Sequence, residues 1–335
     1  MSLINYALNG NLSKFLKNLN QVKEETGKSR ISLFANFINC FIKTGGGYAD
    51  YLNYKFYSKT NKELKEYATI KDQDIFYEIV SPSAYKTAFT IKYNFLNNFK
   101  KYINRDYFYQ GTKEELKLFL TKHPQFIYKP TNGLGGHGVR KMSSNEIKDF
   151  DSFYKDIVEN GNQIEEIIIQ HKEISKFASK SVNTLRIMTF NYKNHSEILE
   201  AMMRIGDGNH DVDNFHQNGM GILVDKETGK LIGKAINKNN EEFEKHPKTN
   251  IKFDGFQIPN WEIIKKTVLE ASKENEHIHV VGWDVAVTED GCTLVEGNRR
   301  PGFDLPQVLY KRGRKDIMRH CLNIINKYEN TNHKI

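Results

Sequence analysis

Apolar residues recur at helical spacing through the first 80 residues of the chain. Leu12, Phe15, Leu16 and Leu19 fall on one face of a helix, and the apolar residues between 31 and 42 repeat the spacing. The three glycines at 45–47 follow this second run, and a glycine run ends regular structure. The pattern predicts a mainly helical region over residues 1–80, in which we identify no chemistry.

Short apolar runs typical of strands appear beyond residue 81. Thr112 and Glu115 form a capping box, which predicts the start of a helix that runs up to Lys122. The late segments 280–287 and 292–298 flank an Asp-Gly pair, which is a hairpin turn signal. The full set of predicted strands is 125–129, 139–142, 165–171, 184–192, 197–205, 280–287 and 292–298.

A glycine-rich loop joins the first two of these strands. Lys129 ends the strand, and Gly133, Gly135, Gly136 and Gly138 follow. Glycines let backbone N–H groups turn toward an anion such as phosphate, and a lysine adds a point charge. The alternative is a plain hairpin tip. The loop is neither a Walker loop nor a Rossmann fingerprint, because it lacks Gly-Lys-Ser/Thr and no helix follows it.

The late hairpin carries three polar side chains that a metal ion would bind. Glu296 and Asn298 share a face because strand side chains alternate, and pairing puts Asp284 on that face. Three oxygen ligands suit Mg²⁺, which binds a few carboxylates together with phosphate oxygens. A solvated polar face on an edge hairpin is the alternative, and the apolar residues of both strands argue against it.

Two arginines lie in the hairpin formed by residues 184–192 and 197–205. Arg186 has apolar neighbours, so its burial requires an anion. That anion is either a protein carboxylate or a phosphate or substrate carboxylate, and the preceding Asn183 favours the second choice. Arg204 is the second cation of this hairpin.

These features occur together in a known family. The chain resembles the sugar-transfer-associated ATP-grasp family over about residues 85–310. The resemblance rests on the order of many short motifs, namely 181–187 (SVNTLRI), 212–215 (VDNF), 219–222 (GMGI), 246–249 (HPKT), 258–261 (IPNW), 282–284 (GWD), 296–298 (EGN) and 301–302 (PG). Asn132 and Leu134 in the glycine loop depart from the pattern, as does the Arg299-Arg300 pair.

The resemblance implies an α+β ATP-grasp fold in which two lobes clamp ATP. It divides the chain into a helical segment at 1–80, a small lobe at 81–160 and a large lobe with the metal site at 161–335. Lys92, at the start of a helix, would lie near the phosphates, and Lys86 competes for that role. Gln170 would be a hinge residue beside the adenine, whose contacts come from backbone groups.

The resemblance also implies site roles that the patterns alone do not assign. Asn183, Asp213 and Asn214 would bind substrate, although Asp213-Asn214 equally fits a plain Asx turn. Arg186, Arg204 and Arg299 would hold reacting groups. The implied activity is an ATP- and Mg²⁺-dependent ligase that joins a carboxylate, such as a sugar acid, to an amine in polysaccharide or capsule assembly. A phosphotransferase and a non-catalytic nucleotide-binding subunit are the alternatives.

Composition changes this interpretation little. The net charge is +8 and the pI is about 9.0. The basic residues are interleaved with acidic ones along the chain, which argues against nucleic acid as a partner. The basic cluster at 311–315 is either a solvated helix start, which we favour, or a contact for an anionic lipid surface or sugar nucleotide. No apolar run is long enough to span a bilayer, and the N-terminus is not a signal peptide.

Cysteines and histidines add no predicted site. Three scattered cysteines form no disulfide framework, which is typical of a cytoplasmic protein. Seven histidines lack the spacing of a zinc site, and we interpret them as structural: His123, His171, His210, His216, His246, His277 and His279.

Overall fold

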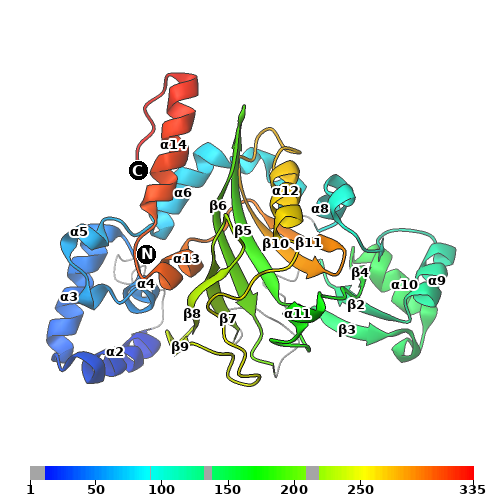
Figure 1. The fold of residues 1–335 in the computed structure, drawn as a ribbon, viewed down its shortest axis with the longest axis horizontal. Coiled ribbons are helices and arrows are strands. Elements are labelled where there is room, and N and C mark those ends of the chain that lie inside the picture. The colour runs from blue at the N-terminus through cyan, green and yellow to red at the C-terminus, as the bar shows by residue number, and fades with distance from the viewer. Residues whose placement is uncertain (1–11, 91, 132–137, 209–218) are drawn as a thin grey trace.

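The computed structural model describes residues 12–90, 92–131, 138–208 and 219–335. A twisted seven-stranded sheet occupies the centre, with a helical region on one side and a small four-stranded sheet on the other (Figure 1). The C-terminal helix, α14 (Lys315–Glu329), runs beside α6 (Ile70–Val80) of the helical region.

The N-terminal region is helical, as the apolar spacing predicts. Gly45 ends α3, with a φ of 70° and an N–H that donates to the carbonyl of Phe41 at 2.8 Å. A positive φ of this kind favours glycine. The helices are α2 (Leu12–Thr26), α3 (Arg30–Thr44), α4 (Tyr48–Asn53), α5 (Asn61–Leu64) and α6 (Ile70–Val80), with 3-10 turns at Phe56–Ser58 and Ser83–Tyr85.

The helical region and the large sheet share one hydrophobic cluster. Phe15, Phe37 and Tyr51 are fully buried in it, and Met202 of the sheet and Leu305 of α13 (Asp304–Tyr310) belong to the same cluster. Burial of such large side chains is the main favourable contribution to folding. The N-terminal helices therefore stabilise the face of the sheet on which they pack.

The small sheet has the strand order β1-β4-β2-β3, and all its neighbours are antiparallel. Its strands are β1 (Tyr107–Phe108), β2 (Gln125–Lys129), β3 (Arg140–Ser143) and β4 (Gln163–Glu166). The predicted capping box is present, because Thr112 accepts from the Glu115 N–H and Glu115 accepts from the Thr112 N–H. It begins α9 (Lys113–Lys122), and α10 (Phe150–Glu159) lies beside it.

The large sheet has the order β11-β10-β5-β6-β7-β8-β9 and is antiparallel throughout. Its strands are β5 (Thr184–Tyr192), β6 (His195–Ile205), β7 (Met220–Val224), β8 (Leu231–Asn237), β9 (Glu242–Phe243), β10 (Val280–Thr288) and β11 (Gly291–Asn298). The helices that accompany it are α7 (Thr87–Thr90), α8 (Lys92–Asn98), with a 3-10 turn at Lys100–Tyr102, and α11 (Lys172–Ser175), α12 (Trp261–Ala271), α13 and α14 (Lys315–Glu329).

One predicted strand is wrong in its position. The apolar run 165–171 indicates a strand, but β4 covers Gln163–Glu166 and the rest of the run is not in a strand. Beyond Glu166 the chain leaves the small sheet and reaches the large one, where the His171 N–H donates to the Val287 carbonyl at 2.7 Å. Consecutive apolar residues cannot distinguish a strand from a buried crossing segment.

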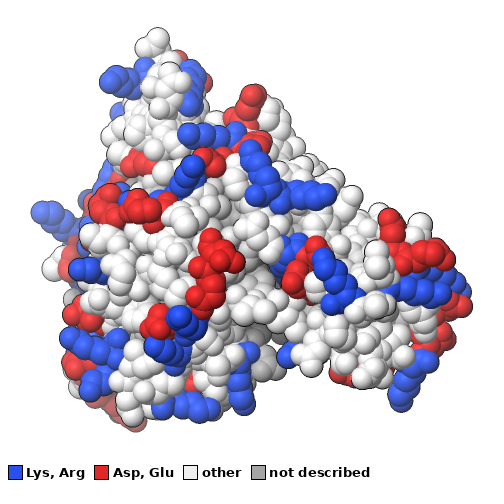
Figure 2. Space-filling view, turned by 45° about the vertical axis from the view of Figure 1, so that its right-hand side comes forward, with Lys and Arg blue, Asp and Glu red and all other residues white. Residues whose placement is uncertain are grey.

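The basic cluster at 311–315 is neutralised within the protein. Its four charged residues form the ion pairs Lys311–Glu242, Arg312–Asp316, Arg314–Glu200 and Lys315–Asp72. Basic and acidic side chains are also interspersed over the face in Figure 2. These pairs agree with the interpretation as a helix start rather than a surface for anions. Among the described residues, no helix is long and apolar enough to cross a membrane.

Candidate functional site

Strands β10 and β11 bring the three predicted metal ligands to one face. Asp284 is the direct partner of Glu296, and Asn298 is the partner of Gly282. Directly opposed residues of an antiparallel pair point to the same side. A Cβ on Gly282 would lie 2.5 Å from the Pro301 side chain, so only glycine allows this approach beside Asn298. The hairpin predicted from the Asp-Gly turn signal is confirmed.

Asp284 of β10 is buried beside two arginines, Arg186 of the neighbouring strand β5 and Arg204 of the next strand, β6. Its carboxylate accepts from Arg186 Nε at 2.5 Å and Nη2 at 3.1 Å, and lies 3.0 Å from Arg204 Nη2. Burial alone would raise the pKa of Asp284, but the two arginines hold it below its ordinary value. The anion next to Arg186 is thus a protein carboxylate, which is the alternative that the sequence favoured less.

Glu296 is in the opposite electrostatic situation. Its side chain is exposed and has no hydrogen-bond or ion-pair partner among the described residues. Neighbouring protein removes part of its water, and the Asp284 charge repels it, so the pKa of Glu296 is raised. A carboxylate held near a second carboxylate without a partner of its own fits a site for a divalent cation.

Lys129 ends β2, as predicted, and belongs to a buried charge network at the small sheet. Its Nζ lies 2.7 Å from Glu165 Oε1, while Arg105 Nε lies 2.6 Å from Glu165 Oε2. Gln163 donates to Glu165 Oε1 at 2.7 Å. Burial alone would raise the pKa of Glu165, but Arg105 and Lys129 lower it to about 2. Burial lowers the pKa of Lys129 despite the attraction of Glu165.

Sequence reasoning missed Arg105 and Glu165. The only signal was the spacing of two between Gln163 and Glu165, which puts both side chains on one face of a strand. Arg105 Nη2 is buried without a hydrogen-bond partner among the described residues, so one donor of this network is unused.

We expect Glu165 to make stability depend on acid pH. A fall in its pKa from 4.5 to about 2 corresponds to about 3 kcal/mol, which is present above about pH 5 and is lost as the pH falls toward 2. Urea unfolding of the wild type between about pH 6 and pH 3 should show this loss. Glu165→Gln should flatten the dependence and lower stability near pH 7, whereas Glu159→Gln, at the exposed end of α10, should match the wild type. An equal acid slope in wild type and Glu165→Gln would contradict the assignment.

Several predicted nucleotide and substrate residues lie outside the described part of the chain. These are Gly133, Gly135, Gly136, Asp213 and Asn214, as well as the side chain of Lys92, whose backbone begins α8 as predicted. Gly138 is described, with a φ of 76°, and a Cβ there would lie 2.7 Å from Pro130 Cγ. This conformation and close approach require glycine at the end of the loop.

Two predicted site residues, Asn183 and Gln170, form hydrogen bonds within the protein. Asn183 is 1% exposed, donates to Ala178 O at 2.9 Å, and accepts from the Gly206 N–H at 3.0 Å. Gln170 donates to Ser181 O at 2.7 Å, and its Oε1 accepts from the backbone N–H and the side-chain Nδ2 of Asn183. The polar atoms of the Asn183 side chain are thus used within the protein, and its substrate-binding role stays a prediction. Adenine contact by the Gln170 backbone stays a prediction.

Arg299 and Arg300, which follow β11, contact different parts of the protein. Arg299 donates to the Ser81 carbonyl at 3.1 Å. Arg300 pairs with Asp74 and Glu78 of α6 and lies over the Tyr77 ring. Arg300 therefore fastens the end of β11 to the helical region, and a catalytic role for Arg299 stays a prediction.

Comparison with known proteins places these features in a family. Residues 51–323 match a family model described as sugar-transfer associated ATP-grasp. No curated protein sequence gives a significant match.

The chain also resembles solved structures at low identity. The ATP-grasp ligase PsnB with a minimal precursor is 13% identical, with a TM-score of 0.45 over 74% of this chain and 64% of that protein. D-alanine–D-alanine ligase from Bacillus anthracis is 14% identical, with a TM-score of 0.41 over 72% and 69%. N5-carboxyaminoimidazole ribonucleotide synthetase from Thermotoga maritima is 10% identical, with a TM-score of 0.41 over 71% and 51%. The chain thus spans less than two thirds of the length of PsnB.

Proposed function

The chain belongs to the sugar-transfer associated ATP-grasp family, and from this premise we propose that it is an ATP-dependent ligase that joins a carboxylate to an amine. Its α+β architecture is an ATP-grasp fold with a helical N-terminal segment. The proposal goes beyond the family in naming the reaction, the two substrate classes and the residues that act on them.

The observation that carries the proposal is the charge arrangement on β5, β6, β10 and β11. Two carboxylates, Asp284 and Glu296, stand side by side, and two arginines, Arg186 and Arg204, form ion pairs with Asp284. Such a surface can receive cations and anions together, as a reaction of ATP with a carboxylate requires. Asp284, Glu296 and Asn298 would hold Mg²⁺, which when bound neutralises phosphate charge.

The proposed reaction has two steps. A substrate carboxylate oxygen attacks the γ-phosphorus of ATP, the bond to the β–γ bridging oxygen breaks, and an acyl phosphate and ADP result. The nitrogen of an amine then attacks the acyl carbon, phosphate leaves, and the amine loses a proton to give an amide. Arg186 and Arg204 would orient the carboxylate, since guanidinium groups bind carboxylate and phosphate in a two-pronged geometry.

The substrate class follows from the family description. Association with sugar transfer favours a sugar acid or sugar nucleotide as the carboxylate and an amino compound as its partner, in polysaccharide or other glycoconjugate synthesis. Lys129 and the glycine loop would bind the ATP phosphates, with Lys92 as a further cation. Glu165 would hold Lys129 in place until nucleotide enters.

Product analysis tests the reaction class. The protein is incubated with MgATP and a panel of sugar acids, each with and without amines, and phosphate release and product mass are measured. A ligase forms a product lighter by one water than acid plus amine. A phosphorylated product formed without any influence of the amine would replace the ligase by a phosphotransferase. Nucleotide binding without turnover for every pair would favour a non-catalytic subunit and overturn the proposal.

A further inference from the structure

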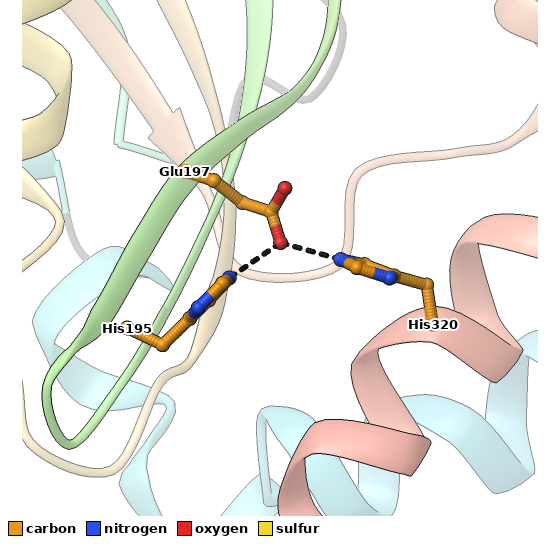
Figure 3. Close-up of side chains that lie close together, drawn as sticks. All are labelled: His195, Glu197 and His320. Carbon is orange, nitrogen blue, oxygen red and sulfur yellow. Dashed lines mark hydrogen bonds and ion pairs between the residues drawn. The ribbon is translucent and has the colours of Figure 1, made fainter.

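Three potential metal ligands meet where the C-terminal helix crosses the β5–β6 hairpin (Figure 3). His195 and Glu197 lie on β6, and His320 lies on α14. The Nε2 atoms of His195 and His320 lie 2.7 Å and 2.6 Å from Glu197 Oε1, and all three ligand atoms fall within 4.8 Å of one another.

Local structure explains why these side chains converge. His195 and Glu197 are two residues apart in a strand, so they project from the same face. His320 is on a helix whose apolar side is buried against the same hairpin, with Met318, Cys321 and Leu322 in a cluster that includes Phe190 and Leu199. That packing holds α14 in register with β6, so the approach of His320 to Glu197 is a consequence of the fold.

The cluster is open to solvent. The exposed fractions of the His195, Glu197 and His320 side chains are 38%, 26% and 50%. An ion can reach them without opening the core.

We propose that His195, Glu197 and His320 bind one Zn²⁺ ion. Two imidazole nitrogens and one carboxylate oxygen are a ligand set that suits Zn²⁺, and three protein ligands leave a fourth position for water. Binding uses the Nε2 lone pairs, so each imidazole carries its proton on Nδ1. Ligand-to-metal distances of about 2.0–2.2 Å are reached by small side-chain rotations, with the ion replacing the two hydrogen bonds to Glu197.

Neighbouring groups favour this cluster over the other candidate. Asp106, His123 and Glu166 also lie close together, but Lys122 Nζ is 2.5 Å from Asp106 Oδ2 and occupies that carboxylate as a cation. Cys321 follows His320 in the chain, but its side chain is fully buried in the apolar cluster that packs α14 against the hairpin, away from solvent.

The ion would join α14 to the β5–β6 hairpin, the same hairpin that carries Arg186 and Arg204. This role differs from the proposed ATP reaction and does not depend on it. The expected effect is a more stable C-terminal helix, because a ligand that binds only the folded state stabilises it by mass action.

Calorimetric titration of ZnCl₂ tests the site. The full chain without a histidine tag is treated with a chelator, freed of it, and titrated without nucleotide. We expect one equivalent to bind the wild type, and His320→Gln and Glu197→Gln to weaken binding at least about 100-fold. His277→Gln, which removes an exposed histidine outside the cluster, should bind as the wild type does.

Two further measurements keep the proposal falsifiable if a variant folds poorly. Wild-type affinity should fall at least about tenfold between pH 7.5 and pH 5.5, because protons compete for the imidazole nitrogens. Zn²⁺ should slow hydrogen exchange in residues 315–329 of the wild type. Absence of Zn²⁺ binding to the wild type, or equal affinity in folded His320→Gln, would overturn the site.

Discussion

Glutamine at position 296 is expected to abolish ATP turnover and to leave the fold as stable as the wild type or more so. The Mg²⁺ ion that binds the phosphates needs charged oxygen ligands from the protein. Losing several kcal/mol of charge stabilisation corresponds to a fall in rate of at least about a thousandfold. Glu296 has no partner among the described residues that the substitution would break.

The expected gain in stability follows from the sign of the pKa shift. The pKa of Glu296 is raised in the folded protein, so folding disfavours its ionised form, and this cost is present above its ordinary pKa. A neutral glutamine removes the repulsion by Asp284. Residues of active sites commonly lower the stability of the folded protein in this way, because function requires them.

Phosphate release and thermal unfolding check both parts of the result. Asp290→Asn is the matched control, because Asp290 is an exposed acidic residue in the turn between β10 and β11. MgATP should raise the melting temperature of the wild type and of Asp290→Asn more than that of Glu296→Gln. Full activity of Glu296→Gln at ordinary Mg²⁺ concentration would remove Glu296 from the metal site.

Lysine at position 186 is expected to keep the charge but lose most of the turnover. Arg186 contacts both oxygens of Asp284 through Nε and Nη2, and lysine cannot reproduce this fork. Loss of one oriented charge-assisted contact in the transition state costs about 100-fold or more. Nucleotide affinity should change less, because Lys129 and the glycine loop remain.

Kinetics and calorimetry separate these effects. The turnover number should fall with little change in the dissociation constant for MgATP, and the protein should stay folded because Arg204 still pairs with Asp284. Arg300→Lys is the control, since Arg300 contacts α6 and lies outside the proposed machinery. If Arg186→Lys turns over ATP at the wild-type rate, Arg186 only balances the buried charge of Asp284.

The pairing of Asp284 with both arginines adds a physical condition to the proposed mechanism. Arg186 and Arg204 already contact the Asp284 carboxylate. To bind a metal ion as well, Asp284 would have to keep these contacts in part or lose them. The arginines would then face the phosphate and the substrate carboxylate. In this proposal one buried charge network serves both the ligand-free protein and the reaction, which reconciles the two alternatives left open for Arg186.

Local patterns in the sequence determined most of the elements that support the site. The short apolar runs predicted β2, β5, β10 and β11 closely, because a strand is formed by residues that are consecutive in the sequence. The glycine after Thr44 and the Thr112 capping box set helix ends for the same reason. The family suggested by the ordered motifs is confirmed, and its model extends to residues 51–323.

Only the tertiary structure decided which charges meet. Asp284 and Arg186 are 98 residues apart and become partners because β10 pairs with β5, a neighbour relation that no local pattern contains. The same holds for Glu165 with Arg105, for His320 with Glu197, and for the internal hydrogen bonds of the buried Asn183 side chain. Periodicity is a local property of the chain, whereas ion pairing and burial depend on strand order and packing between distant segments.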